Sequence, residues 1–231
     1  MTCDQGAAQG AGRPVRVEAG KVALEGELAV PAGAKALVVF AHGSGSGRLS
    51  PRNRLVAGIL NQAGIATLLF DLLTPEEEVR DAMTRHLRFD IGLLSERVEG
   101  ATEWVRRSSE TAGLKIGYFG ASTGAAAALV AAARRPADVA AIVSRGGRPD
   151  LAGDALVRVQ APTLLIVGGY DLPVIKINQD ALTKLRCLKK LVVVPGASHL
   201  FEEPGKIEEV AKLASDWFTR HLVGQRAEPA R

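Results

Sequence analysis

The sequence has little cysteine and few aromatic side chains. Its 231 residues include only Cys3 and Cys187, too few for a disulfide framework, which fits a reducing cytoplasm. Aromatic residues make up 4% and the basic residues are scattered, so a net charge of +4 does not indicate a nucleic-acid-binding surface. No apolar run approaches the ~20 residues that span a membrane, and residues 1–13 lack the features of a secretory signal. These absences favour a cytoplasmic enzyme that binds neither nucleic acid nor membrane.

Metal-binding and nucleotide-binding motifs are missing as well. The sequence contains no HExxH, no CxxC and no carboxylate cluster, and His86 stands alone in a charged segment as an expected surface residue. The glycine-rich stretch HGSGSG at 42–47 lacks the Gly-Lys-Ser/Thr ending of a phosphate-binding loop. We therefore expect neither a metal nor a cofactor.

Apolar runs alternate with helical patterns along the chain. The expected strands occupy residues 15–17, 22–30, 36–41, 66–72, 114–119, 139–143, 163–167 and 190–194. The expected helices occupy residues 51–64, 90–109, 124–133, 175–187 and 206–222. Residues 74–90 begin with a capping box but are highly charged, so we expect a mobile helix or loop over the edge of the sheet.

Strands that alternate with helices indicate the α/β class. We expect a mostly parallel eight-stranded sheet that begins with a β-hairpin and carries helices on both faces. No internal repeat or linker divides the chain. The sequence therefore predicts a single domain over residues 14–223, between disordered tails at 1–13 and 224–231.

Ser122 lies in the most informative stretch, KIGYFGASTGAAAALVAAA at 115–133. A short apolar strand is followed by Gly-x-Ser-x-Gly and then by an alanine-rich helix, which is the context of a nucleophile elbow. Such a turn lifts the serine hydroxyl out of the sheet. Side chains at Gly120 and Gly124 would collide with the neighbouring strand and helix, which explains both glycines. Ser122 is thus the predicted nucleophile.

A serine nucleophile needs a base within hydrogen-bonding reach and an acid that orients this base. His199 follows the last predicted strand on a loop, whereas we expect His221 to be a solvated helix end. Asp171 directly follows the strand TLLIV, although a loop aspartate of this kind also commonly caps a helix. Two rival carboxylates lie one strand out of place: Asp150 and Asp154. The order Ser122, Asp171, His199 predicts a catalytic triad.

The oxyanion that forms during acyl transfer needs backbone N–H donors. One is expected from Thr123, directly after the nucleophile, and the other from Ser44, in the loop that follows the strand 36–41. His42 begins the same loop, and we expect it to brace the loop rather than to act as a second base.

Four arginines follow strand ends at the predicted reactive edge: Arg48, Arg52, Arg145 and Arg148. Surface ion pairs would account for each of them as readily as ligand binding would. The functional hypothesis is recognition of an anionic substrate group, for which the guanidinium is well shaped.

Several motifs in series resemble one family. HGSGSG, GYFGASTGAAAA, SRGGRPDLAG, APTLLIVGGYD and VPGASHLFEEPG are similar to the dienelactone hydrolase-like branch of the α/β-hydrolases, over roughly residues 15–222. Within that branch they resemble a bacterial group sometimes fused to phosphoribosyltransferase domains. The resemblance implies a serine hydrolase with little or no cap and with Ser122, Asp171 and His199 as its triad. Dienelactone hydrolases proper use a cysteine nucleophile, and neither Cys3 nor Cys187 is placed to replace Ser122.

The expected activity is hydrolysis of carboxylic esters, lactones or thioesters of small acyl substrates, through an acyl-enzyme. The absence of a long insertion between the sixth and seventh strands predicts an open site that favours short acyl chains. An acyltransferase, a thioesterase or a peptidase would use the same triad, and a ligand-binding module would keep the fold without catalysis. We expect a small-molecule ester as the partner, and a monomer or homodimer.

Overall fold

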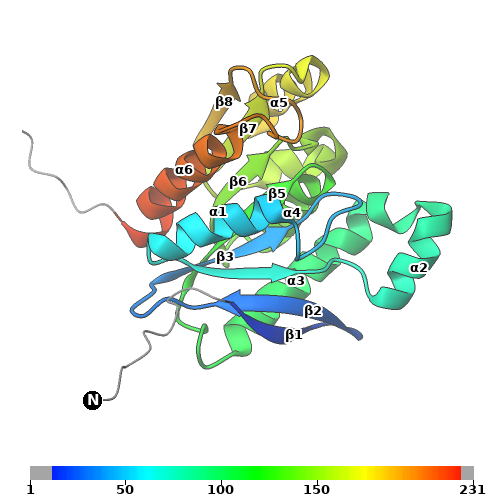
Figure 1. Cartoon of the computed structure of the whole chain (residues 1–231), viewed down its shortest axis with the longest axis vertical. Helices are drawn as coiled ribbons and strands as arrows, with labels where there is room; N and C mark the ends of the chain where they lie inside the picture. The colour runs from blue at the N-terminus through cyan, green and yellow to red at the C-terminus, as the bar shows by residue number, and fades with distance from the viewer. Residues whose placement is uncertain (1–11, 225–231) are drawn as a thin grey trace, which may run out of the picture.

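A computed structural model describes residues 12–224 and shows one eight-stranded sheet with helices on both faces (Figure 1). The strands are β1 (Arg13–Ala19), β2 (Val22–Ala29), β3 (Ala36–Ala41), β4 (Ala66–Phe70), β5 (Lys115–Ala121), β6 (Val139–Arg145), β7 (Thr163–Gly168) and β8 (Lys189–Val194). The α-helices are α1 (Pro51–Gln62), α2 (Pro75–Thr84), α3 (Ile91–Arg107), α4 (Thr123–Arg134), α5 (Leu172–Lys184) and α6 (Lys206–Phe218). Shorter helical segments are η1 (Leu87–Phe89), η2 (Pro149–Arg158) and η3 (Thr219–Val223). The expected α/β sheet is confirmed.

The strands lie in the order β1-β2-β4-β3-β5-β6-β7-β8. β1 and β2 form the predicted antiparallel hairpin, with Val15 opposite Gly26, and β2 also pairs with β4 in antiparallel fashion. All pairs from β4 to β8 are parallel. β1 begins at Arg13, inside the range expected as a tail, and the rest of both predicted tails lies outside the described residues apart from Gly12 and Gly224. The carboxyl ends of the parallel strands therefore meet at one edge of the sheet.

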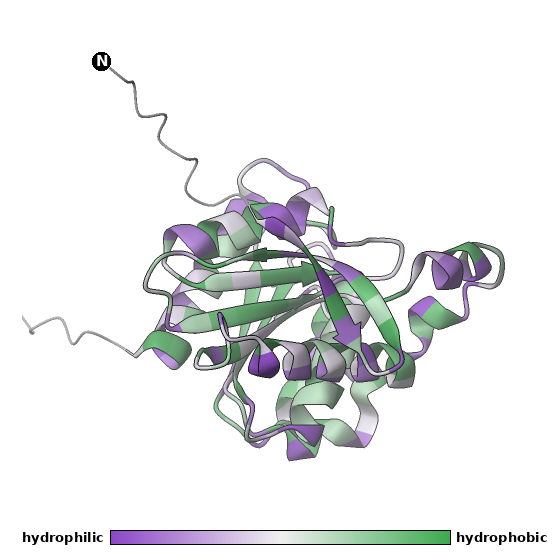
Figure 2. Ribbon diagram, turned by 90° about the horizontal axis from the view of Figure 1, so that it is seen from below, coloured by the Kyte–Doolittle hydropathy of each residue, from purple (hydrophilic) through white to green (hydrophobic). Residues whose placement is uncertain are grey.

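Two apolar layers cover the sheet. α1 and α6 pack on one face with Phe40, Phe119 and Trp217, while α3 and α4 pack on the other with Tyr118 and Leu129. Figure 2 shows the apolar colour concentrated on the central strands, while polar colour appears along the helices and the hairpin strands. All six residues of β3 are buried, as a continuous apolar run predicts for a central parallel strand.

α4 is rich in alanine, which makes up seven of its twelve residues. Alanine is the best helix former, and its small side chain lets the helix approach the sheet closely. Nine of the helix residues, Thr123 to Leu129 with Ala131 and Ala132, are buried. This packing fixes the start of α4, directly after Ser122, against the centre of the sheet.

The segment 74–90 differs from the mobile helix or loop that its charge predicts. The capping box does form, since Thr74 N–H donates to Glu77 and Glu77 N–H donates to the Thr74 hydroxyl. Asp81 is buried and accepts hydrogen bonds from the Leu87 and Arg88 amides and from the Arg88 guanidinium. Burial alone would raise the pKa of Asp81, but these donors outweigh it and hold the pKa below its usual value. The segment is therefore a fixed α2–η1 unit that projects beyond the sheet (Figure 1).

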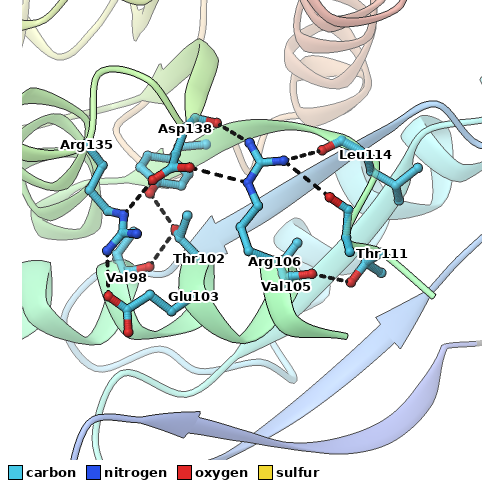
Figure 3. Close-up of polar contacts among 11 residues, drawn as sticks. Val98, Thr102, Glu103, Val105, Arg106, Thr111, Leu114, Arg135 and Asp138 are labelled. Carbon is cyan, nitrogen blue, oxygen red and sulfur yellow. Dashed lines mark hydrogen bonds and ion pairs between the residues drawn. The ribbon is translucent and has the colours of Figure 1, made fainter. Parts of the chain in front are cut away.

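A polar network ties α3 to the amino ends of β5 and β6 (Figure 3). Arg106 donates to the Leu114 and Asp138 carbonyls, and Asp138 also pairs with Arg135. Glu103 binds the same Arg135. Because Leu114 and Asp138 precede their strands, this network lies at the edge of the sheet opposite Ser122.

Candidate functional site

Ser122 occupies a strained turn between β5 and α4. Its backbone has φ 49° and ψ −120°, a conformation that L-residues rarely adopt and that marks functional turns. Its N–H donates to the Arg145 carbonyl at 3.2 Å, and its carbonyl accepts from the Arg148 amide at 3.1 Å. A Cβ at Gly120 would lie 2.4 Å from the Ala125 Cα, and one at Gly124 would lie 2.2 Å from the Ala41 oxygen. The expected role of both glycines is confirmed.

Asp171 and His199 meet at the same edge of the sheet. The Asp171 Oδ2 lies 2.6 Å from the His199 Nδ1, and the side chains are 13% and 38% exposed. Asp171 holds the N-cap position of α5, but its side chain makes no capping hydrogen bond. The carboxylate thus binds the imidazole and does not cap the helix. This contact orients the ring and leaves Nε2 available to accept a proton.

The loop that carries His199 makes one side-chain contact and packs closely against two glycines. Glu203 accepts from the Ser198 amide with both carboxylate oxygens at 3.0 Å, and this bond lowers the pKa of Glu203. A Cβ at Gly168 would lie 2.4 Å from the Ser198 oxygen, and one at Gly146 would lie 3.5 Å from His199 Nδ1. Gly146 follows the residue that binds the Ser122 amide. The end of β6 therefore runs between the serine turn and the histidine loop.

The structure also brings Ser44 and Thr123 together. The Ser44 N–H donates to the Thr123 Oγ1 at 3.0 Å, a contact that the sequence did not predict. Thr123 is the first residue of α4, so its own N–H has no partner within the helix. Gly43 passes so close to the nucleophile that a Cβ there would lie 3.1 Å from the Ser122 Cβ. The loop after β3 and the start of α4 thus form one surface beside Ser122.

His42 braces this loop from inside the protein. Its Nδ1 lies 2.9 Å from the Gly43 carbonyl and its Nε2 lies 2.9 Å from the Leu72 amide, so the first nitrogen donates and the second accepts. Only a neutral imidazole satisfies both contacts. Burial lowers the pKa of His42, although Gly43 and Asp71 act in the opposite direction. The geometry fits the expected bracing role.

Acid should therefore loosen the fold through His42. The folded protein holds the pKa of His42 below the ordinary value of about 6.5. The contribution of neutral His42 to the unfolding free energy is therefore complete above that pH, and it is lost as the pH falls toward the lowered pKa. The unfolding free energy of the native protein should fall more steeply between about pH 7.5 and about pH 5 than that of His42→Gln, by up to ~1.4 kcal/mol per pH unit. Urea denaturation across this range measures both slopes, and parallel slopes would contradict the assignment.

A cavity of about 440 Å³ opens beside Ser44 and Thr123. Its walls are the loop 42–49, the residues 71–73 that follow β4, and the inner side of the α2–η1 unit. Arg88 and Glu78 also line it. Partial burial, followed by the nearby Asp71 carboxylate, raises the pKa of Glu78. Sequence reasoning missed Asp71, although a carboxylate directly after a parallel strand was a usable signal.

Residues 24–223 match the sequence profile of the dienelactone hydrolase family. The chain belongs to this family. A dienelactone hydrolase structure from Anabaena variabilis is 63% identical, with a TM-score of 0.91 over 93% of this chain and 99% of that one. Est1E from Butyrivibrio proteoclasticus shares the fold at 15% identity, with a TM-score of 0.75 over 90% of this chain and 98% of that one. The expected α/β-hydrolase fold without a separate cap domain is thus confirmed.

A curated relative from Mycobacterium tuberculosis (strain H37Rv) bears the name "Putative phosphoribosyl transferase". It is 59% identical over 210 residues, which cover 91% of this chain and 46% of the relative. The chain therefore spans about half the length of this relative. None of the helices in residues 12–224 is both long and apolar enough to cross a membrane.

The four arginines that the sequence placed at the reactive edge of this dienelactone hydrolase family member fall into two groups. Three form ion pairs: Arg48 with Asp71, Arg52 with Glu202, and Arg148 with Asp150. Arg145 makes no ion pair and no side-chain hydrogen bond within residues 12–224. The sequence could not show which arginines form ion pairs. Asp71 and Glu202 are far from their partners along the chain and are brought close only by the fold, and Asp150 is one of several charged residues near Arg148.

Other candidates lie away from Ser122 or are engaged elsewhere. His86 is exposed as expected, but His221 is not a solvated helix end, since it packs against Trp217 with ring centroids 4.3 Å apart. Cys187 lies near Thr163, the first residue of β7, at the opposite edge of the sheet. Residues 12–224 contain no cluster of three or more His, Cys, Asp or Glu that would hold a metal ion.

Proposed function

We propose that this chain is a serine hydrolase that cleaves esters, lactones or thioesters of small carboxylic acids. The observation that carries the proposal is the strained Ser122 turn at the sheet edge where Asp171 and His199 form their 2.6 Å contact. Family membership supports hydrolysis in general. The serine turn supports Ser122 as the nucleophile, and the size of the neighbouring cavity supports small substrates.

In the proposed reaction the Ser122 Oγ attacks the acyl carbonyl while His199 Nε2 takes its proton. Asp171 holds the ring and stabilises the imidazolium. The developing oxyanion is bound by the Thr123 N–H and by the Ser44 N–H, which exchanges its contact with the Thr123 hydroxyl for the substrate oxygen. His199 returns the proton to the leaving group, an acyl-enzyme forms, and water activated by His199 releases the acid.

The size of the cavity supports small acyl groups. About 440 Å³ lies near the lower end of the range for small-molecule pockets, and α2–η1 covers one side of it. A small cavity that is covered on one side favours short acyl chains over long ones.

Transfer of a phosphoribosyl group, which the relatives' name describes, has no comparable support in this chain. The aligned 210 residues make up 46% of the relative, and because they cover 91% of this chain they include most of the part that matches the dienelactone hydrolase family. We infer that the named activity belongs to the remainder of the relative. The same triad would also serve an acyltransferase or a peptidase, but no observation here favours either.

A fluorophosphonate probe tests the proposal directly, because it reacts with an activated serine. We expect labelling of the native protein, an adduct on the peptide that contains Ser122, and no labelling of Ser122→Ala. A p-nitrophenyl ester series should show a maximum at short acyl chains. Labelling that persists in Ser122→Ala would refute the nucleophile, and a maximum at long chains would refute the assigned substrate size.

A further inference from the structure

Asn178 is a fully buried amide in the middle of α5. Its side chain is 0% exposed, and its Nδ2 donates to the Gly147 carbonyl at 3.0 Å and to the Val174 carbonyl at 2.8 Å. Its Oδ1 is buried and has no hydrogen-bond partner within residues 12–224. Burial of an unpaired oxygen costs free energy that an apolar side chain would avoid. The two N–H groups are therefore what Asn178 contributes at this position.

The carbonyl that Asn178 binds belongs to a short segment, residues 145–148, that holds the serine turn from both ends. The Arg145 carbonyl accepts from the Ser122 N–H at 3.2 Å, and the Arg148 N–H donates to the Ser122 carbonyl at 3.1 Å. Ser122 has a φ of 49°, and a backbone conformation of this kind persists only where its surroundings hold it. The orientation of Ser122 therefore depends on the position of the 145–148 segment.

The same segment also lies between the other two members of the predicted triad. A Cβ at Gly146 would lie 3.5 Å from His199 Nδ1, so the segment packs against the imidazole. α5, which carries Asn178, begins directly after Asp171. Among residues 12–224, Asn178 makes the only side-chain hydrogen bond to the backbone of the segment. Its amide thus connects the helix that follows the acid to the segment that holds the nucleophile.

We propose that Asn178 is a positioning residue, which fixes the 145–148 segment through the Gly147 carbonyl and thereby aims the Ser122 hydroxyl at the acyl carbonyl. This inference rests on the proposed hydrolysis at Ser122 and adds a residue on which that reaction depends. Asn178 is fully buried, so it acts on the orientation of the nucleophile and not on contact with the substrate. A displacement of about 1 Å near a reacting group lowers a rate by about 10²-fold.

Asn178→Ala removes both donors and tests this role. With a short p-nitrophenyl ester, the burst of nitrophenol release measures the acylation rate constant and the substrate dissociation constant separately. We expect acylation to slow by about 10- to 100-fold while the dissociation constant stays within about three-fold of native. Fluorophosphonate labelling should slow by a similar factor, since it also requires attack by Ser122.

Ala181→Gly is the matched control for a general disturbance of α5. Ala181 is buried in the same helix, about one turn beyond Asn178. Glycine weakens a helix but leaves the Asn178 amide in place. The acylation rate constant of Ala181→Gly should therefore stay within about three-fold of native.

Asn178→Asp gives a measurement that depends on the donor itself. The introduced carboxyl has nearly the shape of the amide, and only its protonated form can donate to the Gly147 carbonyl. Because burial raises the pKa of a carboxyl, we expect proton uptake as the pH falls from about 8 to about 6. The acylation rate constant, divided by that of the native protein at the same pH, should rise several-fold over this range. The same ratio for Asn178→Ala should stay constant.

The contrary results separate this inference from the proposed function. Native-like acylation in Asn178→Ala, an equal loss in Ala181→Gly, or a loss in substrate binding alone would overturn the positioning role and leave the proposed hydrolase intact. If Asn178→Ala does not fold, the ratio for Asn178→Asp decides the question, and a ratio that does not change with pH overturns the role. No hydrolysis and no labelling of the native protein would overturn both proposals.

Discussion

Asp171→Asn is expected to lower kcat by about 10⁴-fold, with little change in KM for a small ester. The native carboxylate can only accept, so it holds the proton of His199 on Nδ1, 2.6 Å away, and leaves Nε2 free to act as a base. An amide can instead donate to Nδ1, which places the proton on Nε2 and removes the base. Steady-state kinetics with a short p-nitrophenyl ester measure the effect.

The fold should survive this change. The Asp171 side chain makes no capping bond to α5, and asparagine has nearly the same shape. Circular dichroism and thermal melting should therefore be close to native. Asp154→Asn is the matched control, because this exposed residue in η2 was one of the two rival carboxylates. Activity of Asp171→Asn within ten-fold of native would mean that His199 is oriented by another group.

The elements nearest the chemistry were predictable from the sequence because local patterns encode them. The Gly120–Gly124 turn is dictated by the strand before it and the alanine-rich helix after it. A Cβ added at either glycine would lie under 3 Å from backbone atoms. Asp171 and His199 each follow a strand, and parallel strands bring their carboxyl ends to one edge. Chain order and strand direction were therefore sufficient to bring the two side chains together.

Features that depend on pairing across the fold were not predictable in this way. The charge of residues 74–90 suggested mobility, but one buried carboxylate, Asp81, collects three donors and fixes the α2–η1 unit. The segment η2 was missed because its helical turns are interrupted at Gly153, where φ is 53°. The four arginines looked alike in the sequence, and only their three-dimensional surroundings single out Arg145. Ion pairing reflects distances that a linear pattern does not contain.

Gly124→Ala should have the largest effect on stability of any substitution near the site. The added Cβ would lie 2.2 Å from the Ala41 oxygen and 2.3 Å from the His42 oxygen, and both are backbone atoms that cannot rotate away. The start of α4 would have to move off the end of β3. We expect a loss of at least about 4 kcal/mol of unfolding free energy, measured by urea denaturation.

The same displacement should disable the proposed reaction centre in any molecules that still fold. Moving α4 away from β3 separates the Thr123 amide from the loop of Ser44, whose N–H now lies 3.0 Å from the Thr123 hydroxyl. Fluorophosphonate labelling of the folded fraction should therefore be lost as well. Gly58→Ala in α1 is the control, since a Cβ there meets nothing within 4 Å and alanine favours a helix by about 1 kcal/mol. If Gly124→Ala matched Gly58→Ala in stability and labelling, the close contact between α4 and β3 would not be what holds the proposed oxyanion donors, the Ser44 and Thr123 amides, in place.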